Sequence, residues 1–423
     1  MASILSSAAE LSSQAALSTE IGSSGVGILK SSGIPATTTL SFQKYFKNNW
    51  NSIKSFPKYF QKPFSMSKLI LYALIFIGLI IGCIYLYKYL NTEGFDDFSN
   101  VAQQQAKKRI NLLKVSPTVN VNEDDNKLIY SQPLTFKQTA YMGNLVFDGD
   151  LGVLEQLRTG SRTFFLQIDY LENSLDKTRY GSTYTPVLVL RNNNNMLVSK
   201  NSASLKQVFS SIFNYFNNSS VPLYNNPVVL LLHFVRLPYD ETDTDNYIKY
   251  IDSVTDALSV LDSVTIKGYS KASKESDLFN LDFNQFNKQV IIGTNIDTNL
   301  KNIPIQLNNK IHFRYYEIKD DPVDITDRTS SIDNVNAIIY NADYLLSITD
   351  SNEQQKFAKA HKDKFVIVKS KNDQNITPEN MDFLLNTLNV NVIPYDYYSV
   401  NDSSAIQTFG LYNNSSYKLK TVF

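Results

Sequence analysis

Four side chains with acid–base or metal-binding potential lie at or just beyond the ends of apolar segments. They are Asp148, Asp150, Asp169 and His233. Carboxylate and imidazole groups act as general acids and bases, and they bind metal ions. The sequence therefore allows a hydrolytic or metal-assisted site around them. Three of these groups also have a structural explanation, because a turn accounts for the two aspartates around Gly149 and a hydrogen-bonded core position accounts for His233.

Histidine and cysteine are scarce, which limits the disulfides, metal sites and acid–base sites that the chain can form. The 423 residues include three histidines and a single cysteine, Cys83. One cysteine allows no intrachain disulfide and excludes zinc sites with two or more cysteine ligands. The acidic segments 239–245 and 320–327 do not have the pattern of a calcium-binding helix–loop–helix, so we interpret them as solvated loops. No G-x-S-x-G, H-E-x-x-H or G-x-x-x-x-G-K-[ST] pattern occurs. We expect neither a cofactor nor a metal ion.

The elements that would position these residues alternate between apolar strands and helix-like segments. Several strands, such as 228–236, are apolar at almost every position, as is typical of strands buried on both faces of a sheet. This alternation indicates a parallel sheet in an α/β fold, and about eight units favour a TIM-type (β/α)8 barrel. An open doubly wound sheet is the alternative. The predicted strands cover 134–141, 163–171, 186–190, 228–236, 264–269, 289–293, 311–317, 345–349, 365–369 and 390–395, and the predicted helices include 204–216, 245–261, 351–361 and 378–388.

Three segments resemble, in the same order, strands of the phosphatidylinositol-specific phospholipase C catalytic domain. LRTGSRTFFLQIDYL (157–171) has Gly160 and Arg162 where that family has L-x-x-G-x-R. The segment that begins PVLVLRNNNN (186–212) resembles a P-V-x-x-H-G strand followed by a hairpin and a helix, and NPVVLLLHF (226–234) resembles a P-V-I-L-S-L-E strand. The closing residues NNSSYKLKTVF resemble the family's G-Y-V-L-K-P strand more loosely. The resemblance is strongest over 130–236 and implies a phospholipase C-like barrel over 127–423.

The catalytic histidines and the metal-binding acids that this resemblance would imply are missing from the sequence. The family uses one histidine as general base and one as general acid, and these would fall near 141–144 and 190–195. No histidine occurs before residue 233. The family's acidic metal-binding positions fall on a phenylalanine and a glutamine, and the acid of its third strand falls on a histidine. The resemblance therefore implies a degenerate barrel mouth without catalytic, cofactor-binding or metal-binding residues. The positions concerned are Tyr141, Asp148, Asp150, Phe165, Gln167, Asp169, Arg191 and His233.

A membrane anchor is the clearest signal in the chain. The nineteen residues LILYALIFIGLIIGCIYLY (69–87) are uncharged and lie between Lys68 and Lys88. As a helix they would extend about 28 Å, which matches the hydrocarbon core of a bilayer. We predict a transmembrane helix over 68–90, and a helix buried in a protein core is the alternative. The anchor includes Leu69, Ile75, Ile80 and Tyr87.

The segment before the anchor is basic and amphipathic. Residues 41–67 contain five lysines and no acidic residue, and their aromatic side chains recur at spacings of three and four. This pattern predicts an interfacial helix beside the anchor, with an ordinary basic linker as the alternative. Its interfacial residues are Phe42, Phe46, Trp50 and Lys54. Residues 1–40 are rich in small polar residues and are expected to be disorder-prone, and 91–126 are expected to form a stalk with a short helix over 103–114.

The charge is distributed unevenly along the chain. Residues 1–90 carry eight lysines and two glutamates, a net charge of +6, so the remaining 32 basic and 38 acidic residues give −6. An acidic body argues against nucleic acid as a partner, whereas a basic head fits an anionic membrane surface. We expect a single-pass membrane protein with its N-terminus on the lysine-rich side.

Together these features favour a structural protein over an enzyme. A single anchor, a disorder-prone head and a silenced barrel resemble the membrane-anchored virion proteins of large DNA viruses. That resemblance implies a minor capsid component in the internal membrane of the virion, with the lipid bilayer and capsid proteins as partners. The alternatives are a membrane-tethered phosphodiesterase with a rebuilt site, or a module that binds a headgroup or a sugar without turnover.

Overall fold

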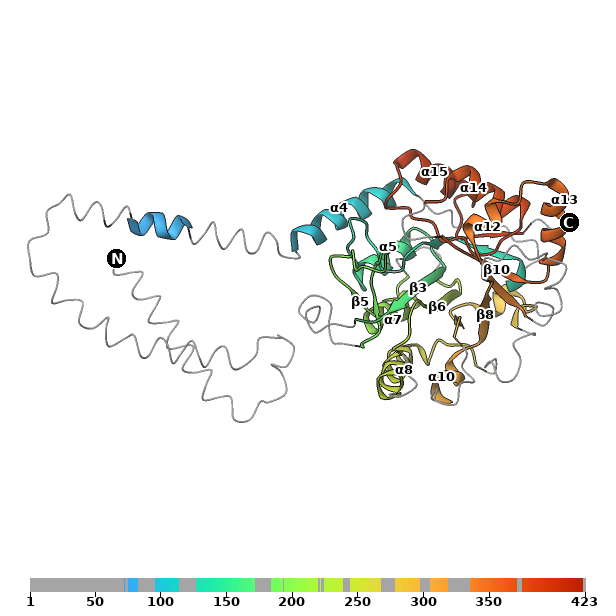
Figure 1. Cartoon of the computed structure of the whole chain (residues 1–423), viewed down its shortest axis with the longest axis horizontal. Coiled ribbons are helices and arrows are strands. Elements are labelled where there is room, and N and C mark those ends of the chain that lie inside the picture. Colours follow the sequence, from blue (N-terminus) through green and yellow to red (C-terminus); the bar gives the residue numbers. More distant parts are fainter. Residues whose placement is uncertain are drawn as a thin grey trace, which may run out of the picture. The chain divides into compact units, whose positions relative to one another are not determined.

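A computed structural model of the chain divides it into two compact units, residues 1–90 and 91–423, and each is described by itself (Figure 1). The described residues are 72, 75–82, 96–113, 127–171, 184–192, 194–219, 221, 224–238, 244–267, 278–296, 305–318, 335–370 and 375–420.

A curled parallel sheet forms the centre of the second unit (Figure 1). Each of its strands pairs in parallel with the next in chain order, and these pairings run from β2 to β10. Isolated parallel bridges then join Val392 to Ile367 of β10 and Tyr395 to Phe136 of β2, so the segment 392–395 connects the two outer strands. The strands are β2 (Thr135–Phe136), β3 (Thr163–Asp169), β6 (Val228–Phe234), β7 (Val290–Thr294), β8 (Phe313–Glu317), β9 (Ala337–Asn341) and β10 (Phe365–Lys369).

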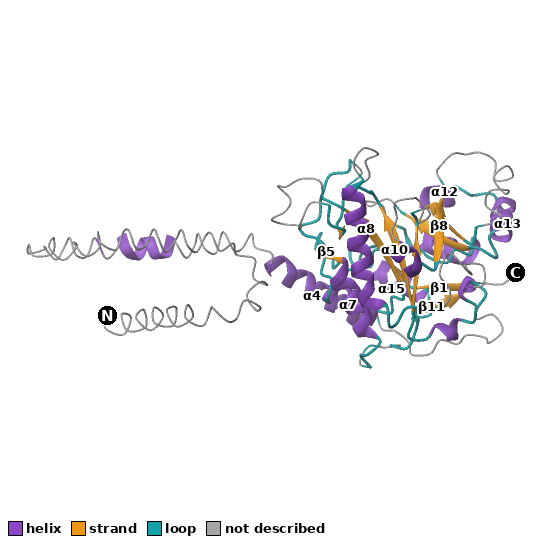
Figure 2. Ribbon diagram, turned by 90° about the horizontal axis from the view of Figure 1, so that it is seen from below, coloured by secondary structure: helices purple, strands orange, loops and turns teal. Residues whose placement is uncertain are grey.

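Helices surround the strands (Figure 2). An outer core lies between the strands and the helices, and an inner core lies inside the curl of the sheet. Side chains alternate along each strand, so Leu166 and Ile168 face the helices whereas Phe165 faces the inside of the curl. The α-helices are α5 (Leu151–Arg158), α7 (Leu205–Tyr215), α8 (Asp245–Leu258), α10 (Ile305–Lys310), α12 (Ala342–Leu346), α13 (Ser351–Ala360), α14 (Pro378–Asp382) and α15 (Asp402–Gly410). Short helical turns are η4 (Leu128–Tyr130), η6 (Ser259–Leu261), η7 (Phe283–Phe286) and the π-helical η8 (Phe383–Thr387).

The inner core is dense enough to require a glycine at one strand position. A Cβ atom on Gly293 of β7 would lie 2.4 Å from Cζ of Phe313. Because no real Cβ contact is that short, only glycine lets the Phe313 ring lie inside the curl. The inside of the sheet is therefore filled by side chains, as in other parallel barrels of this size.

Short antiparallel pairs are added to the parallel sheet. β1 (Ser131–Pro133) lies beside β11 (Tyr417–Leu419), as Figure 2 shows, and β4 (Val187–Leu188) pairs with both β3 and β5 (Ala203–Ser204). The Tyr417 hydroxyl donates to the carbonyl of Pro227, just before β6. The closing segment of the sequence thus ties the amino ends of the strands together.

Arg162, one of the residues that carry the family resemblance, is buried before β3. Its Nη1 donates to the carbonyls of Leu157 (2.9 Å) and Ser161 (2.6 Å). Its guanidinium lies 4.9 Å from the centre of the Tyr215 ring. Burial lowers the pKa of Arg162 and raises that of Tyr215 to about 12. We interpret Arg162 as a structural residue that joins the amino end of β3 to α7.

The helix α4 (Asp96–Leu112) lies within the segment expected to be a stalk, and it packs on α5 and α15 of the second unit. Arg109 pairs with Asp402 at 2.9 Å and donates to the carbonyl of Val400 at 2.7 Å. Leu113, just beyond the helix, is buried in the outer core. The helix is longer than the predicted 103–114, and its carboxyl end is held by both charge and apolar contacts.

The predicted anchor extends beyond the described residues on both sides. Residues 75–82 form a helix whose apolar side chains are exposed, including Ile75 and Ile80. In the part of the chain that the structure describes, no helix has the length and hydropathy needed to cross a bilayer. The predictions for 1–40 and 41–67, with Phe42, Phe46, Trp50 and Lys54, lie outside the described residues, as do Leu69 and Tyr87.

The α/β class with a parallel sheet is confirmed, but three of the predicted strands are not regular strands among the described residues. Residues 345–349 were expected as a strand, whereas the strand is β9 and α12 follows it directly. Asn341 begins that helix by accepting a hydrogen bond from the backbone amide of Asp343. In the predicted strand 264–269, the described residues 264–267 contribute an isolated bridge, from Thr265 to Val290, and in 390–395 only Val392 and Tyr395 form bridges. Short apolar runs have no clear period, so they do not distinguish a strand from a helix.

Candidate functional site: the carboxyl ends of the parallel strands

The parallel strands bring their carboxyl ends to one edge, which we call the mouth. We define it by Gln167, Asp169, His233, Glu317 and Lys369, the residues at or near the ends of β3, β6, β8 and β10. Sites in folds of this kind lie at that edge because the connections that follow the strands converge there. The register of the sheet places Gln167 directly opposite His233.

An aromatic stack fills the floor of the mouth. The His233 ring lies between two others, with centroids 5.1 Å from Phe165 at 26° and 6.3 Å from Tyr315 at 12°. All three side chains are at most 2% exposed. Phe165 and His233 are both predicted mouth residues, and the structure places their rings in contact, whereas Tyr315 is not among the predicted residues. Tyr315 lies 82 residues after His233, so no local sequence pattern links the two.

His233 is held in its neutral form. Burial, with a smaller effect of the Lys369 charge, lowers the pKa of its imidazole to about 3. Its Nδ1 atom is buried and has no hydrogen-bond partner among the described residues. An acid or base that works near neutral pH needs a pKa near 7, so this imidazole neither donates nor accepts a proton effectively.

The charged rim above the stack is internally paired. Lys369 Nζ lies 2.8 Å from Oε1 of Glu317, and both side chains are partly exposed. Burial raises the pKa of Tyr315 well above its usual value, and the Glu317 charge adds to this effect. The rim therefore presents one ion pair above a layer of neutral rings.

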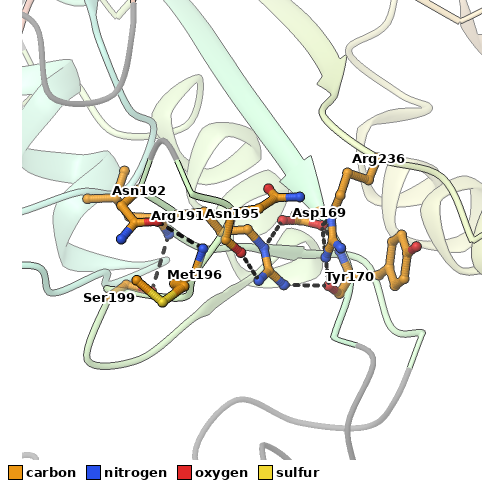
Figure 3. A network of polar contacts seen from close by, with 9 residues as sticks. Asp169, Tyr170, Arg191, Asn192, Asn195, Met196, Ser199 and Arg236 are labelled. Carbon is orange, nitrogen blue, oxygen red and sulfur yellow. Dashed lines mark hydrogen bonds and ion pairs between the residues drawn. The ribbon is translucent and has the colours of Figure 1, made fainter.

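Asp169 lies between two arginines at the end of β3 (Figure 3). Arg191 Nε donates to its Oδ2 at 2.6 Å, and Arg236 Nε donates to Oδ1 at 2.9 Å. The Arg191 Nη2 and Arg236 Nη2 groups both donate to the carbonyl of Tyr170, at 3.2 and 2.9 Å. The Arg236 guanidinium also lies 4.5 Å from the centre of the Tyr170 ring.

The Asp169 cluster joins three segments of the chain through hydrogen bonds and ion pairs. The Asp169 carboxylate is buried, and charge-assisted bonds together with the backbone amide of Tyr170 occupy its oxygens. It therefore offers few free lone pairs to a metal ion. It joins the ends of β3 and β6 to the hairpin after β4. Arg236 was missed by the sequence analysis, although a basic residue just past a buried strand was a usable signal.

The hairpin that carries Arg191 owes its shape to the asparagine run. Arg191 pairs with Leu197 in an antiparallel bridge, and its Nη1 donates to the carbonyl of Asn195 at 2.9 Å. The Asn192 Oδ1 atom accepts the backbone amide of Met196 at 2.9 Å. Asn195 has a positive φ of 65°, which asparagine tolerates better than most residues. Arg191 thus closes this turn and binds it to Asp169, as Figure 3 shows.

The three remaining predicted residues have contacts of a different kind. Asp148 Oδ1 accepts the amides of Asp150 (3.0 Å) and Leu151 (2.8 Å), which begins α5. Asp150 is exposed and accepts a hydrogen bond from the Ser211 hydroxyl. The Tyr141 ring packs edge-on against a neighbouring phenylalanine in the outer core. The turn interpretation accounts for both aspartates.

Metal-binding groups do not assemble within the described residues. No set of three or more histidine, cysteine, aspartate or glutamate side chains there is close enough to hold an ion. The imidazole of the mouth, His233, lies in the aromatic stack. The carboxylates of Asp169 and Glu317 form ion pairs with Arg191 and Lys369.

No protein-family model and no curated protein sequence matches this chain. Its fold is similar to that of a calcium-dependent phosphoinositol-specific phospholipase C from a Gram-negative bacterium, Pseudomonas sp., with a TM-score of 0.43, 11% identity and coverage of 72% of this chain and 98% of that chain. A protein of Galdieria sulphuraria described as a glycerophosphodiester phosphodiesterase gives 0.38 at 11% identity, covering 67% and 98%. A Ca2+-dependent phosphatidylinositol-specific phospholipase C from Streptomyces antibioticus gives 0.37 at 8%, covering 66% and 98%. The similarity is one of fold alone.

Proposed function

We propose that this chain is a membrane-anchored structural protein whose phospholipase C-like barrel carries out no catalysis. In this proposal it is a minor virion component that links a capsid shell to an internal membrane. The observation that carries the proposal is the stack of Phe165, His233 and Tyr315 at the floor of the mouth. Two of these neutral rings, Phe165 and His233, occupy positions where the phospholipase C family that the sequence resembles has carboxylates.

The other histidines support the absence of an acid–base pair. His312 lies between the backbone groups of Ile292 and Ile266, and His361 lies between Tyr340 and the carbonyl of Phe357. Burial lowers the pKa of each to about 4. Both imidazoles are thus used in hydrogen bonds within the fold.

The anchor in this proposal rests on the apolar helix around 75–82. Its side chains include exposed isoleucine, phenylalanine and leucine. An exposed helix of this composition is stable in water only when another apolar phase covers it. A bilayer is the occupant that fits the uncharged run 69–87 and the lysines at its two ends.

Two measurements on the full-length protein test the proposal. The protein is reconstituted in phosphatidylinositol-containing vesicles and assayed for release of phosphorylated inositol, with and without calcium. We expect no turnover above vesicles alone, and we expect the protein to remain with the membrane after a carbonate wash. Turnover above that of vesicles alone would establish the rebuilt phosphodiesterase instead. Release into the wash would refute the anchor.

A binding module is the second candidate, and one observation favours it. The His233 Nδ1 atom and the Tyr315 hydroxyl have no hydrogen-bond partner within the described chain, and the half-buried Gln167 lies beside them. Such groups could bind a headgroup or a sugar without turnover. Calorimetric titration with inositol phosphates and simple sugars tests this, and binding that Gln167→Ala removes would favour the module.

A further inference from the structure

The second unit contains a long segment without acidic residues. Residues 177–239 hold six lysines and arginines and no aspartate or glutamate. The rest of 91–423 has 26 basic and 38 acidic residues, so this segment is a basic part of an acidic unit. An excess of basic charge on one part of an acidic protein directs that part toward anionic partners.

The hairpin after β4 exposes amide, basic and apolar side chains of this segment. Its tip includes the exposed Asn194 and Asn195, and Met196 beside them is 57% exposed. Lys200 on the returning arm is half-buried, and Lys206 in the first turn of α7 is exposed. We call these five residues the hairpin surface. A large apolar side chain among amide and basic groups fits a layer of lipid headgroups.

The hairpin is connected through one loop to α4, the helix of the second unit that follows the predicted anchor in the sequence. Gln105 of α4 accepts a hydrogen bond from the Asn144 side chain at 3.0 Å. The next residue, Leu145, accepts the backbone amide of Lys200 at 2.8 Å. In agreement with these contacts, α4, β5 and α7 lie on one side of the second unit in both views (Figure 1, Figure 2).

The covalent chain limits how far this side can be from the bilayer that the proposed anchor would span. The uncharged run ends at residue 87 and α4 begins at Asp96. Nine residues reach at most about 32 Å, whatever their conformation. The helix from Asp96 to Gln105 adds about 14 Å. Binding of the hairpin surface to that bilayer would be intramolecular, so a weak attraction is sufficient.

We propose that the hairpin surface binds the anionic headgroup layer of the bilayer that holds the anchor. This inference rests on the anchor of the proposed function. Lys200 and Lys206 would be attracted to lipid phosphates, the asparagine amides would donate hydrogen bonds to headgroups, and Met196 would enter the acyl boundary. The bond from Arg191 to Asp169 at 2.6 Å holds the base of the hairpin against β3. A bilayer is favoured over nucleic acid because the same chain carries the apolar run 69–87.

Fluorescence from a single label tests this surface in the full-length protein. Cys83 is the only cysteine, so Cys83→Ser allows one introduced cysteine to carry a polarity-sensitive dye. Met196→Cys places the dye in the hairpin. Gln355→Cys is the matched control, because Gln355 is exposed in α13, which lies away from β5 in both views (Figure 1, Figure 2). The protein is reconstituted in vesicles of phosphatidylcholine and phosphatidylserine in equal parts, with brominated lipid as the quencher.

We expect brominated lipid to quench the label at position 196 and to leave the label at 355 unchanged. High salt should weaken the quenching because it screens the attraction. Lys206→Gln should lower the ratio of bound to unbound hairpin roughly fivefold, since one lysine near an anionic surface is lost. Lys359→Gln, which removes an exposed lysine of α13, should leave that ratio unchanged.

The outcomes separate this inference from the proposed function. Equal quenching at the two positions, in protein that stays with the vesicles through a carbonate wash, would overturn the inference and leave the anchor intact. A label at 196 that responds to added DNA but not to anionic lipid would also overturn it, in favour of a nucleic-acid surface. Release of the protein into the wash would refute the anchor, and the inference would fall with it.

Discussion

Mild acid should destabilise the second unit (91–423), because His233, His312 and His361 are all buried in the neutral form. The Nδ1 atom of His312 accepts the amide of Ile292 at 2.7 Å, so Nε2 carries the proton and faces the carbonyl of Ile266. His361 donates from Nδ1 to the carbonyl of Phe357 and accepts from the Tyr340 hydroxyl at 2.8 Å. A second proton on either ring would remove an acceptor that the fold uses.

The magnitude follows from the pKa values. Folding lowers the pKa from 6.5 to about 3 for His233 and to about 4 for His312 and His361. The unfolded chain therefore binds more protons below pH 6.5, so the stabilisation is complete above that pH and is lost as the pH falls. Each histidine contributes about 1.4 kcal/mol per pH unit, which is about 2 kcal/mol between pH 6.5 and 5. Three histidines give about 6 kcal/mol, comparable to the stability of many domains.

Urea titrations of the full-length protein in detergent, followed by circular dichroism at pH 5, 5.5, 6, 6.5 and 7, measure this effect. In that range ordinary carboxylates remain charged, so the histidines dominate the slope. His312→Gln keeps a side chain with one donor and one acceptor but removes the titration, and it should reduce the slope by about a third. A free energy of unfolding that is constant between pH 5 and 7 would show that the histidines are not neutral in the folded state.

Three further predictions concern single groups. His233→Phe should raise the free energy of unfolding at pH 6 by about 1 kcal/mol, measured in urea, because it keeps the stack and removes a buried unpaired nitrogen. Asp169→Asn should lower it by about 3–5 kcal/mol because two guanidiniums lose their counter-charge, whereas Asp150→Asn at an exposed position should change it by less than about 0.5 kcal/mol. Burial lowers the pKa of Lys420 to about 7, so wild-type stability should rise by up to about 1.4 kcal/mol per unit between pH 7 and 9. Lys420→Met should abolish that rise, and a slope that persists in the variant would assign it to another group.

The sequence predicted the layers of the fold well because buried parallel strands are apolar along their whole length. β3 and β6 lie within the predicted strands 163–171 and 228–236. The family resemblance assigned Phe165 and Gln167 to the mouth, and the alternation of side chains along a strand puts both on the face that meets His233.

The sequence could not predict how the charges of the site are paired. Asp169 is an isolated acid in the sequence, and its partners Arg191 and Arg236 lie 22 and 67 residues away. Which cation meets a given carboxylate depends on the curl of the sheet and on the hairpin that the asparagine run allows. The same holds for Tyr315, which reaches His233 across β7.

Under the proposed function, the stack at the mouth also explains why single substitutions would not create a catalytic site. Phe165 and His233 contact each other, and both are almost fully buried. A carboxylate at either position alone would be an unpaired buried charge beside an aromatic ring, which is strongly destabilising. Building a metal site there would need both positions to change together with a bound cation, because each charge is tolerable only when the others are present. The neutral stack is therefore a stable alternative to a charged site, and the two arrangements are separated by intermediates that fold poorly.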